Sequence, residues 1–142
     1  MLSSNLSGRT VACHQHITPV IICIVGPLLQ AGARVRMAPC NPDSTDDRTA
    51  THLASMGVEI RGHAGMSAVE HADALAWLAN EPADALCDMG GELIAAAAGG
   101  TGVPGARPLG LHLEGPWIHA GAAGAQPLAN ALETNSSLTS IV

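Results

Sequence analysis

The chain has 142 residues, of which 47% are hydrophobic, and this length and composition predict one domain with a substantial buried core. Its formal net charge is −6, and all six basic residues are arginines. The acidic balance and the content of only two aromatic residues exclude a basic, base-stacking surface for nucleic acid, and the lack of lysine excludes Schiff-base catalysis. The most apolar stretch, residues 20–29, is too short to span a bilayer, so we expect no membrane partner.

Short apolar runs and helix signals alternate from the N-terminus onward. Residues 10–13 follow a Ser/Gly turn and suit a buried strand. Thr18 is placed to cap a helix over residues 19–30, in which Pro27 should introduce a kink or a restart. Residues 34–37 form the next apolar run, which predicts a second strand.

The same alternation continues through the middle of the chain. Ser44 or Thr45 is expected to cap a helix that runs through Met56 and ends at Gly57. Residues 58–60 then predict a third strand.

Ser67 and Glu70 have the spacing of a capping box and predict a helix from residue 68 through residue 78. Residues 85–89 predict a fourth strand and residues 92–98 a short Ala-rich helix. Strands separated by helices predict an α/β fold with an open, mainly parallel sheet flanked by helices, of the Rossmann-like type.

The organisation of the chain changes near residue 99. We expect residues 1–98 to form the α/β core, and the Gly/Ala-rich residues 99–142 to form an extension that completes the same domain. Residues 109–113 are a candidate fifth strand within this extension.

The four cysteines form no CxxC pair, and the N-terminus lacks the pattern of a secretory signal. Both features indicate reduced thiols in a cytoplasmic protein without a metal site. In parallel sheets, ligands bind where the strands end, so function is expected in the loops around residues 14–18, 38–45, 62–65 and 88–92.

Three sequence blocks carry a family resemblance: CHQHITPVI, AGARVRMAPCNPDSTDD and ALCDMGGELI. In order and spacing, residues 7–97 resemble the N-terminal substrate-binding domain of S-adenosylhomocysteine hydrolases. A fourth and weaker block, LETNSS, is similar to the family's segment that helps to hold the ribose.

The resemblance implies roles for individual residues. His16 corresponds to the family's catalytic histidine, and Asp88 to the first aspartate of the family's Asp-Asp-Gly-Gly-Asp-Leu turn. The implied substrate-binding positions are Thr18, Cys40, Asn41, Met89, Glu133 and Thr134.

The departures from the family pattern affect the chemistry. Met89 stands where the family has its second, catalytic aspartate, and Val20 stands where a carboxylate reads the adenine amino group. The family's active-site lysine has no counterpart, and the chain lacks the GxGxxG loop of the cofactor half. We therefore expect no cofactor, and we expect that the chain does not run the family's redox reaction unaided.

Three functions remain open. The first is a cofactor-free enzyme in which His16, supported by Asp88, transfers protons in an elimination, addition, isomerisation or cyclisation of a nucleoside-like or specialised metabolite. The second is a module that binds a nucleoside or S-adenosylhomocysteine without catalysis, and the third is a fragment without independent function. In either of the first two cases we expect a small-molecule ligand and a homo-oligomer.

Structural roles compete with these functional ones. His14 suits packing or hydrogen bonding within the first strand, Asp88 can accept backbone N–H groups of the Gly90-Gly91 turn, and Cys40 can be an inert thiol. A second local resemblance, GLHLEGPWIHAG, is similar to the metal-binding segment of N-acetylglucosamine-6-phosphate deacetylases. Those enzymes need a barrel of about 250 residues, so we assign it no metal role.

Overall fold

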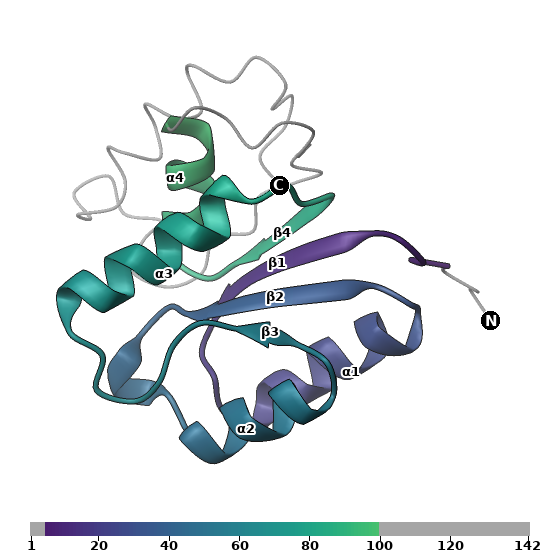
Figure 1. Ribbon diagram of the computed structural model, residues 1–142, viewed down its shortest axis with the longest axis horizontal. Helices are drawn as coiled ribbons and strands as arrows, with labels where there is room; N and C mark the ends of the chain where they lie inside the picture. Colours follow the sequence, from purple (N-terminus) through teal and green to yellow (C-terminus); the bar gives the residue numbers. More distant parts are fainter. Residues whose placement is uncertain (1–4, 100–142) are drawn as a thin grey trace.

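The computed structural model describes residues 5–99, which form a four-stranded parallel sheet flanked by helices (Figure 1). The strands are β1 (Thr10–Gln15), β2 (Arg34–Pro39), β3 (Glu59–Ile60) and β4 (Ala85–Asp88). Their spatial order is β3-β2-β1-β4, so β1 and β2 are central. All three pairings are parallel, which confirms the α/β fold expected from the sequence.

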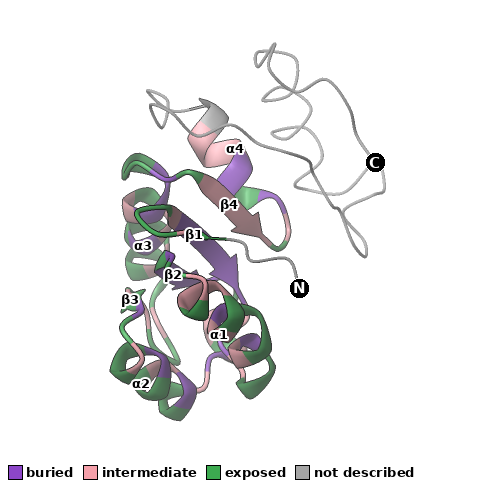
Figure 2. Cartoon of the chain, turned by 90° about the vertical axis from the view of Figure 1, so that its right-hand side faces the viewer, coloured by how far each residue is buried: buried purple, intermediate pink, exposed green. Residues whose placement is uncertain are grey.

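Helices α1 and α2 cover one face of this sheet, and α3 covers the other (Figures 1 and 2). α4 follows β4 and packs against α3. Two short 3₁₀ turns, η1 and η2, connect the strand ends to α1 and α2. The bounds are η1 (Pro19–Ile21), α1 (Ile22–Gln30), η2 (Pro42–Ser44), α2 (Asp47–Ser55), α3 (Ala68–Asn80) and α4 (Glu92–Gly99).

The alternation of side chains along β1 creates two separate cores. Val11 and Cys13 point towards α1 and α2, whereas Ala12 belongs to the cluster below α3 and α4. The α1–α2 cluster is built from aliphatic side chains that include the fully buried Leu53. The α3–α4 cluster is rich in alanine, which lets the helices approach the sheet closely, and the buried side chains of His14 and Arg36 lie on this side.

The strands and helices predicted for residues 10–98 are all present. The two central strands are longer than predicted because their last residues, Gln15 and Pro39, still pair in register with each other. The first helix begins with a 3₁₀ turn, and it continues through Pro27 without the predicted restart. Thr18 occupies the expected N-cap position, but its side chain makes no cap hydrogen bond.

The cap of α2 differs from the prediction. Its N-cap is Asp46, whose side chain accepts from the N–H of Arg48, and not Ser44 or Thr45. The two predicted caps are already engaged, because both hydroxyl groups donate to the carbonyl of Asn41 in the η2 turn. The capping box of α3, formed by Ser67 and Glu70, is confirmed.

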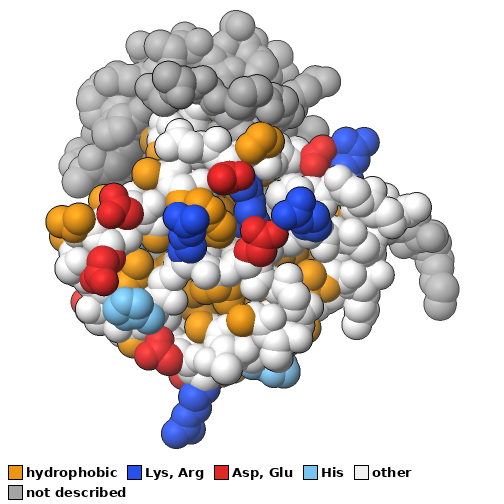
Figure 3. Space-filling model, in the orientation of Figure 1, with side chains coloured by type: hydrophobic (Ala, Val, Ile, Leu, Met, Phe, Trp, Pro, Cys, Tyr) orange, Lys and Arg blue, Asp and Glu red, His pale blue; other side chains and the backbone are white. Residues whose placement is uncertain are grey.

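Charged side chains of both signs are mixed on the face seen in Figure 3, where arginines stand next to acidic groups. Among the described residues, Arg34 lies 2.7 Å from Glu59, and Arg9 lies 2.8 Å from Asp84. None of the helices within residues 5–99 is long and apolar enough to cross a bilayer. The candidate strand 109–113 and most of the predicted extension 99–142 lie outside the described residues.

Candidate functional site

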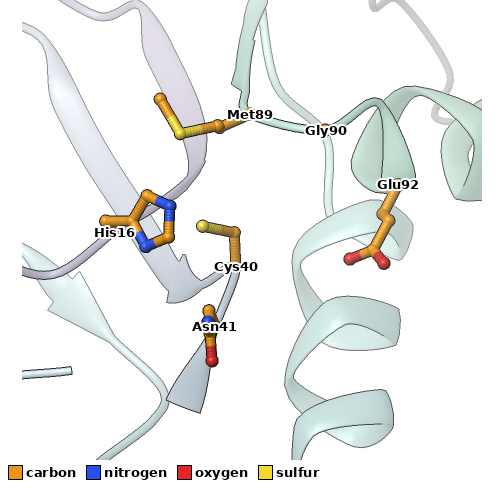
Figure 4. Close-up of a pocket in the computed structure, with 6 residues that line it drawn as sticks. All are labelled: His16, Cys40, Asn41, Met89, Gly90 and Glu92. Atoms are coloured by element: carbon orange, nitrogen blue, oxygen red, sulfur yellow. The ribbon is translucent and has the colours of Figure 1, made fainter. Parts of the chain in front are cut away.

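The carboxyl edge of the sheet carries a hollow with a volume of about 270 Å³ (Figure 4). Three strand ends and the start of α4 supply its walls, which agrees with the rule that ligands bind outside the carboxyl ends of parallel strands. The lining residues are His16, Cys40, Asn41, Met89, Gly90 and Glu92.

The parallel ladder itself brings these loops together. The N–H of Cys40 donates to the carbonyl of Gln15 over 3.1 Å, and the N–H of Met89 donates to the carbonyl of His14 over 2.9 Å. The ladder hydrogen bonds thus continue one residue past the ends of β2 and β4. As a result, three loops that are distant in sequence begin at the same level above the sheet.

The ring of His16 is held by the η2 turn. Its Nδ1 lies 2.6 Å from Oγ of Ser44, and the same hydroxyl group donates to the carbonyl of Asn41 over 3.1 Å. A serine hydroxyl has one hydrogen, so both contacts are satisfied at once when Nδ1–H of His16 donates to Ser44. Nε2 then carries the lone pair, which is the arrangement that a general base needs.

Asp88 pairs with His14 and not with His16. Oδ1 of Asp88 lies 3.1 Å from Nδ1 of His14, Oδ2 accepts the N–H of Ile94 over 2.9 Å, and the side chains of both Asp88 and His14 are fully buried. The predicted support of His16 by Asp88 is therefore absent from this structure. The reason is register: Asp88 and His14 are partners on neighbouring strands, whereas His16 follows the end of β1.

The glycine pair after β4 positions the start of α4, which forms one wall of the hollow. Gly90 and Gly91 have φ values of 99° and 82°, a region that favours glycine, and the resulting tight turn starts α4 directly above Asp88. This turn places Glu92, the first residue of α4, at the hollow. Sequence reasoning missed Glu92, although an acidic residue that opens a helix after a Gly-Gly turn was the available signal.

The surroundings of Cys40 favour the neutral thiol over the thiolate. Burial, together with the nearby carboxylates of Glu92 and Asp88, raises the pKa of Cys40 to about 11. This agrees with the alternative of an inert thiol, because a nucleophilic cysteine needs a lowered pKa. Cys40 therefore contributes shape and a weak hydrogen-bond donor to the hollow.

Comparison of the sequence with known proteins identifies the family of this chain. Residues 2–106 match the family description "S-adenosyl-L-homocysteine hydrolase", which covers most of the chain. The chain belongs to this family. It is 38% identical to the adenosylhomocysteinase of Aeropyrum pernix over 62% of this chain and 21% of the relative.

Two further relatives show the same extent of similarity. The adenosylhomocysteinase of Archaeoglobus fulgidus is 34% identical over 63% of this chain and 22% of its own length. The S-inosyl-L-homocysteine hydrolase of Methanopyrus kandleri is 30% identical over 63% of this chain and 21% of its own length. The chain thus spans about a fifth of the length of the curated relatives that it matches.

The structure brings only some of the positions suggested by the hydrolase resemblance together. His16, Cys40, Asn41 and Met89 line one hollow, whereas Thr18 and Asp88 do not line it. Glu133 and Thr134 lie outside the described residues, so their roles stay predictions.

The described residues of this family member also limit which larger groups fit. None of the strand-to-helix loops within residues 5–99 has the G-x-G-x-x-G spacing used for dinucleotides, and the hollow is small for such a ligand. Across the same residues, no cluster of three or more His, Cys, Asp or Glu side chains has the arrangement of a metal site.

Proposed function

We propose that the hollow binds a nucleoside-like small molecule and that His16 transfers a proton to or from it. The observation that carries this proposal is the placement of His16: it lines the hollow at the carboxyl edge, and Ser44 fixes its Nδ1. An imidazole held in one tautomer presents its other nitrogen in a fixed direction, which favours general acid–base catalysis near neutral pH. The chemistry would be an elimination, addition, isomerisation or cyclisation that needs only proton transfer and no cofactor.

The ligand class follows from the relatives and from the walls of the hollow. The relatives are named as hydrolases of adenosyl and inosyl homocysteine, and these two names differ in the purine. Met89 is 40% exposed and makes one wall of the hollow apolar, while Asn41 and Glu92 supply polar groups to its other walls. A nucleoside thioether, with an apolar base and a polyhydroxylated sugar, suits such a mixture.

A ligand-binding module without catalysis is the second candidate. The observation that favours it is Met89, which stands in the hollow at the position where the family pattern has an acid. Such a module would bind the same ligands as the proposed enzyme, so binding alone does not separate the two. Turnover by the wild-type chain, and its loss in the His16→Ala variant, does separate them.

The test measures binding and turnover on the full chain, with adenosine, inosine and S-adenosylhomocysteine as probes. A probe at a hundred times its dissociation constant should stabilise the fold by about 2.7 kcal/mol. If the chain is an enzyme, His16→Ala should lower turnover by about 10² to 10⁴ while the fold is retained. His52→Ala, which changes an exposed histidine on α2, is the matched control and should leave turnover unchanged.

Each possible result decides between the candidates. Binding with turnover that depends on His16 supports the enzyme, and binding without turnover supports the module. Absence of stabilisation by all three probes would contradict the proposed ligand class. Full activity of His16→Ala, or stoichiometric nicotinamide dinucleotide in a heat-denatured sample, would contradict the proposed mechanism.

A further inference from the structure

A second histidine lies behind the wall of the hollow and has one unsatisfied nitrogen. His14 is fully buried, and its Nδ1 lies 3.1 Å from Oδ1 of Asp88. Its Nε2 has no hydrogen-bond partner among residues 5–99. The nearest charged atom on that side is Oε2 of Glu92 at 3.9 Å. His14 thus lies between a buried carboxylate and one that reaches the hollow.

The carboxylate of Asp88 determines where the ring of His14 carries its hydrogen. Asp88 already accepts the N–H of Ile94 through Oδ2, and an ionised carboxylate only accepts hydrogen bonds. Nδ1 of His14 must therefore carry a hydrogen. Nε2 is then the atom whose protonation changes, and Glu92 is the group that faces this atom.

The other groups around the ring do not satisfy Nε2. His71 of α3 stacks against His14 with ring centroids 6.0 Å apart, but its own Nε2–H donates to the carbonyl of Pro39 over 2.8 Å. The thiol of Cys40, at the end of β2, faces the same two carboxylates and stays neutral because its pKa is raised to about 11. Asp88, Glu92, His71 and Cys40 are thus the titratable groups that β2, β4, α3 and α4 place around His14.

We propose that Glu92 and His14 form a second proton-transfer pair of this hollow, on the wall opposite His16. Glu92 would contact a hydroxyl or amino group of the ligand. His14, which lies behind Glu92 as seen from the hollow, would be a positioning residue that accepts the proton from Glu92 and later returns it. Figure 4 shows the two walls, with His16 on one side and the carboxylate of Glu92 on the other. The catalytic part of this inference rests on the proposed function, whereas the pairing itself does not.

The proton transfer balances without any further reactant. The carboxylate of Glu92 takes the proton of a ligand O–H group, whose electron pair stays on the ligand oxygen. A rotation of the half-exposed Glu92 side chain closes the 3.9 Å gap to Nε2 of His14 and passes that proton on, so that the imidazolium lies between two carboxylates and Glu92 is again ionised. The reverse transfer returns the proton to a leaving or product oxygen. With His16 on the opposite wall, an acid and a base would act on two sides of one ligand.

The first experiment needs no ligand and uses the full chain labelled with ¹⁵N-histidine. Long-range ¹H–¹⁵N spectra report which ring nitrogens of His14 carry hydrogen at each pH. We expect a hydrogen on Nδ1 throughout. In Glu92→Gln, the doubly protonated ring should lose about threefold in proton affinity, because a half-exposed carboxylate 3.9 Å away no longer stabilises the cation.

The matched control is Glu59→Gln on β3, at the opposite edge of the sheet from β4. Its side chain is 50% exposed, compared with 46% for Glu92, and the change should leave the His14 signals unaltered. A His14 ring without hydrogen on Nδ1, or one that responds equally to both substitutions, would overturn the pairing.

The second experiment tests the role in catalysis with His14→Asn. The amide of asparagine can still donate to Asp88, but it has no counterpart of Nε2. We expect binding of adenosine and S-adenosylhomocysteine to persist while the pH–rate profile loses one limb, and Glu92→Gln should lose the same limb. An unchanged profile in both folded variants would overturn the relay, even if the spectra support the pairing. Absence of any binding by the wild-type chain would instead contradict the proposed function and leave the spectral result to decide the pairing.

Discussion

The two faces of the sheet bury different kinds of side chain. The face below α1 and α2 buries an aliphatic cluster that includes Val25, Val35 and Leu53. The face below α3 and α4 buries small residues together with the polar side chains of His14 and Arg36. An aliphatic cluster stabilises a fold without constraining its chemistry, whereas each buried polar group that is left unpaired costs stability. The comparison indicates that the α1–α2 face is packed mainly by aliphatic side chains, whereas the α3–α4 face also holds the buried His14–Asp88 pair behind the hollow.

The largest expected effect is the loss of folding stability when a buried leucine is truncated on either face of the sheet. Leu53→Ala and Leu78→Ala each remove a fully buried leucine from a helix, on opposite faces of the sheet. Each should lower the free energy of unfolding by about 2–5 kcal/mol in urea titrations, because a cavity remains. Only Leu78→Ala should also change the NMR signals of the His14 ring, since α3 carries His71. Equal changes at His14 in both variants would remove the distinction between the faces.

Asp88→Ala tests the polar face alone. The change leaves Nδ1 of His14 and the N–H of Ile94 without their buried acceptor. We expect a loss of about 1–3 kcal/mol in the free energy of unfolding, together with fraying of α4 in hydrogen exchange. Asp43→Ala is the control, since this residue sits in the exposed η2 turn and should have little effect. Unchanged protection of α4 would show that Asp88 does not anchor this helix.

Two half-buried cysteines, one on the α1–α2 side and one at the hollow, should differ in their rate of alkylation. On the α1–α2 side, Cys87 accepts a hydrogen bond from the thiol of Cys13, which lowers the pKa of Cys87 to about 7. At the hollow, burial raises the pKa of Cys40 to about 11. At pH 8 we therefore expect a larger thiolate fraction at Cys87 than at Cys40. We expect alkylation by iodoacetamide to be about tenfold faster at Cys87, since the larger thiolate fraction outweighs its lower intrinsic nucleophilicity.

Peptide mass mapping separates these two thiols from Cys23, which is exposed. Glu92→Gln should speed the alkylation of Cys40 alone, because the negative charge that helps to raise its pKa is removed. Faster alkylation of Cys40 than of Cys87 in the wild-type chain would contradict the assignment of both environments.

The smallest expected effect is that of a local cap. Ser67→Ala removes the side-chain acceptor of the α3 capping box and should cost about 1 kcal/mol of stability in thermal or urea unfolding. The hollow should be unaffected, because this cap lies at the start of α3 and none of its groups line the hollow. Ser55→Ala, at the end of α2, is a control that changes a hydroxyl without removing a cap. A marked loss of probe binding in Ser67→Ala would connect α3 to the hollow more tightly than the contacts suggest.

Much of the fold and part of the site were predictable from the sequence. The alternation of short apolar runs with capped helices predicted the parallel sheet, because periodicity and capping are local properties. The same pattern placed His16, Cys40 and Asn41 in loops after strands, and the sheet then brought them to one hollow. The cap of α2 was misassigned because Ser44 and Thr45 compete for a carbonyl group that only the folded η2 turn presents.

The sequence by itself determined the α/β class, the strand-end loops and the presence of His16 in one of them. Only the tertiary structure decided which carboxylate meets which histidine. Register pairs Asp88 with His14, and the Gly90-Gly91 turn brings Glu92 to the hollow. Local patterns specify which face or loop a residue occupies, but partners across strands depend on register and turn geometry, which are properties of the assembled sheet.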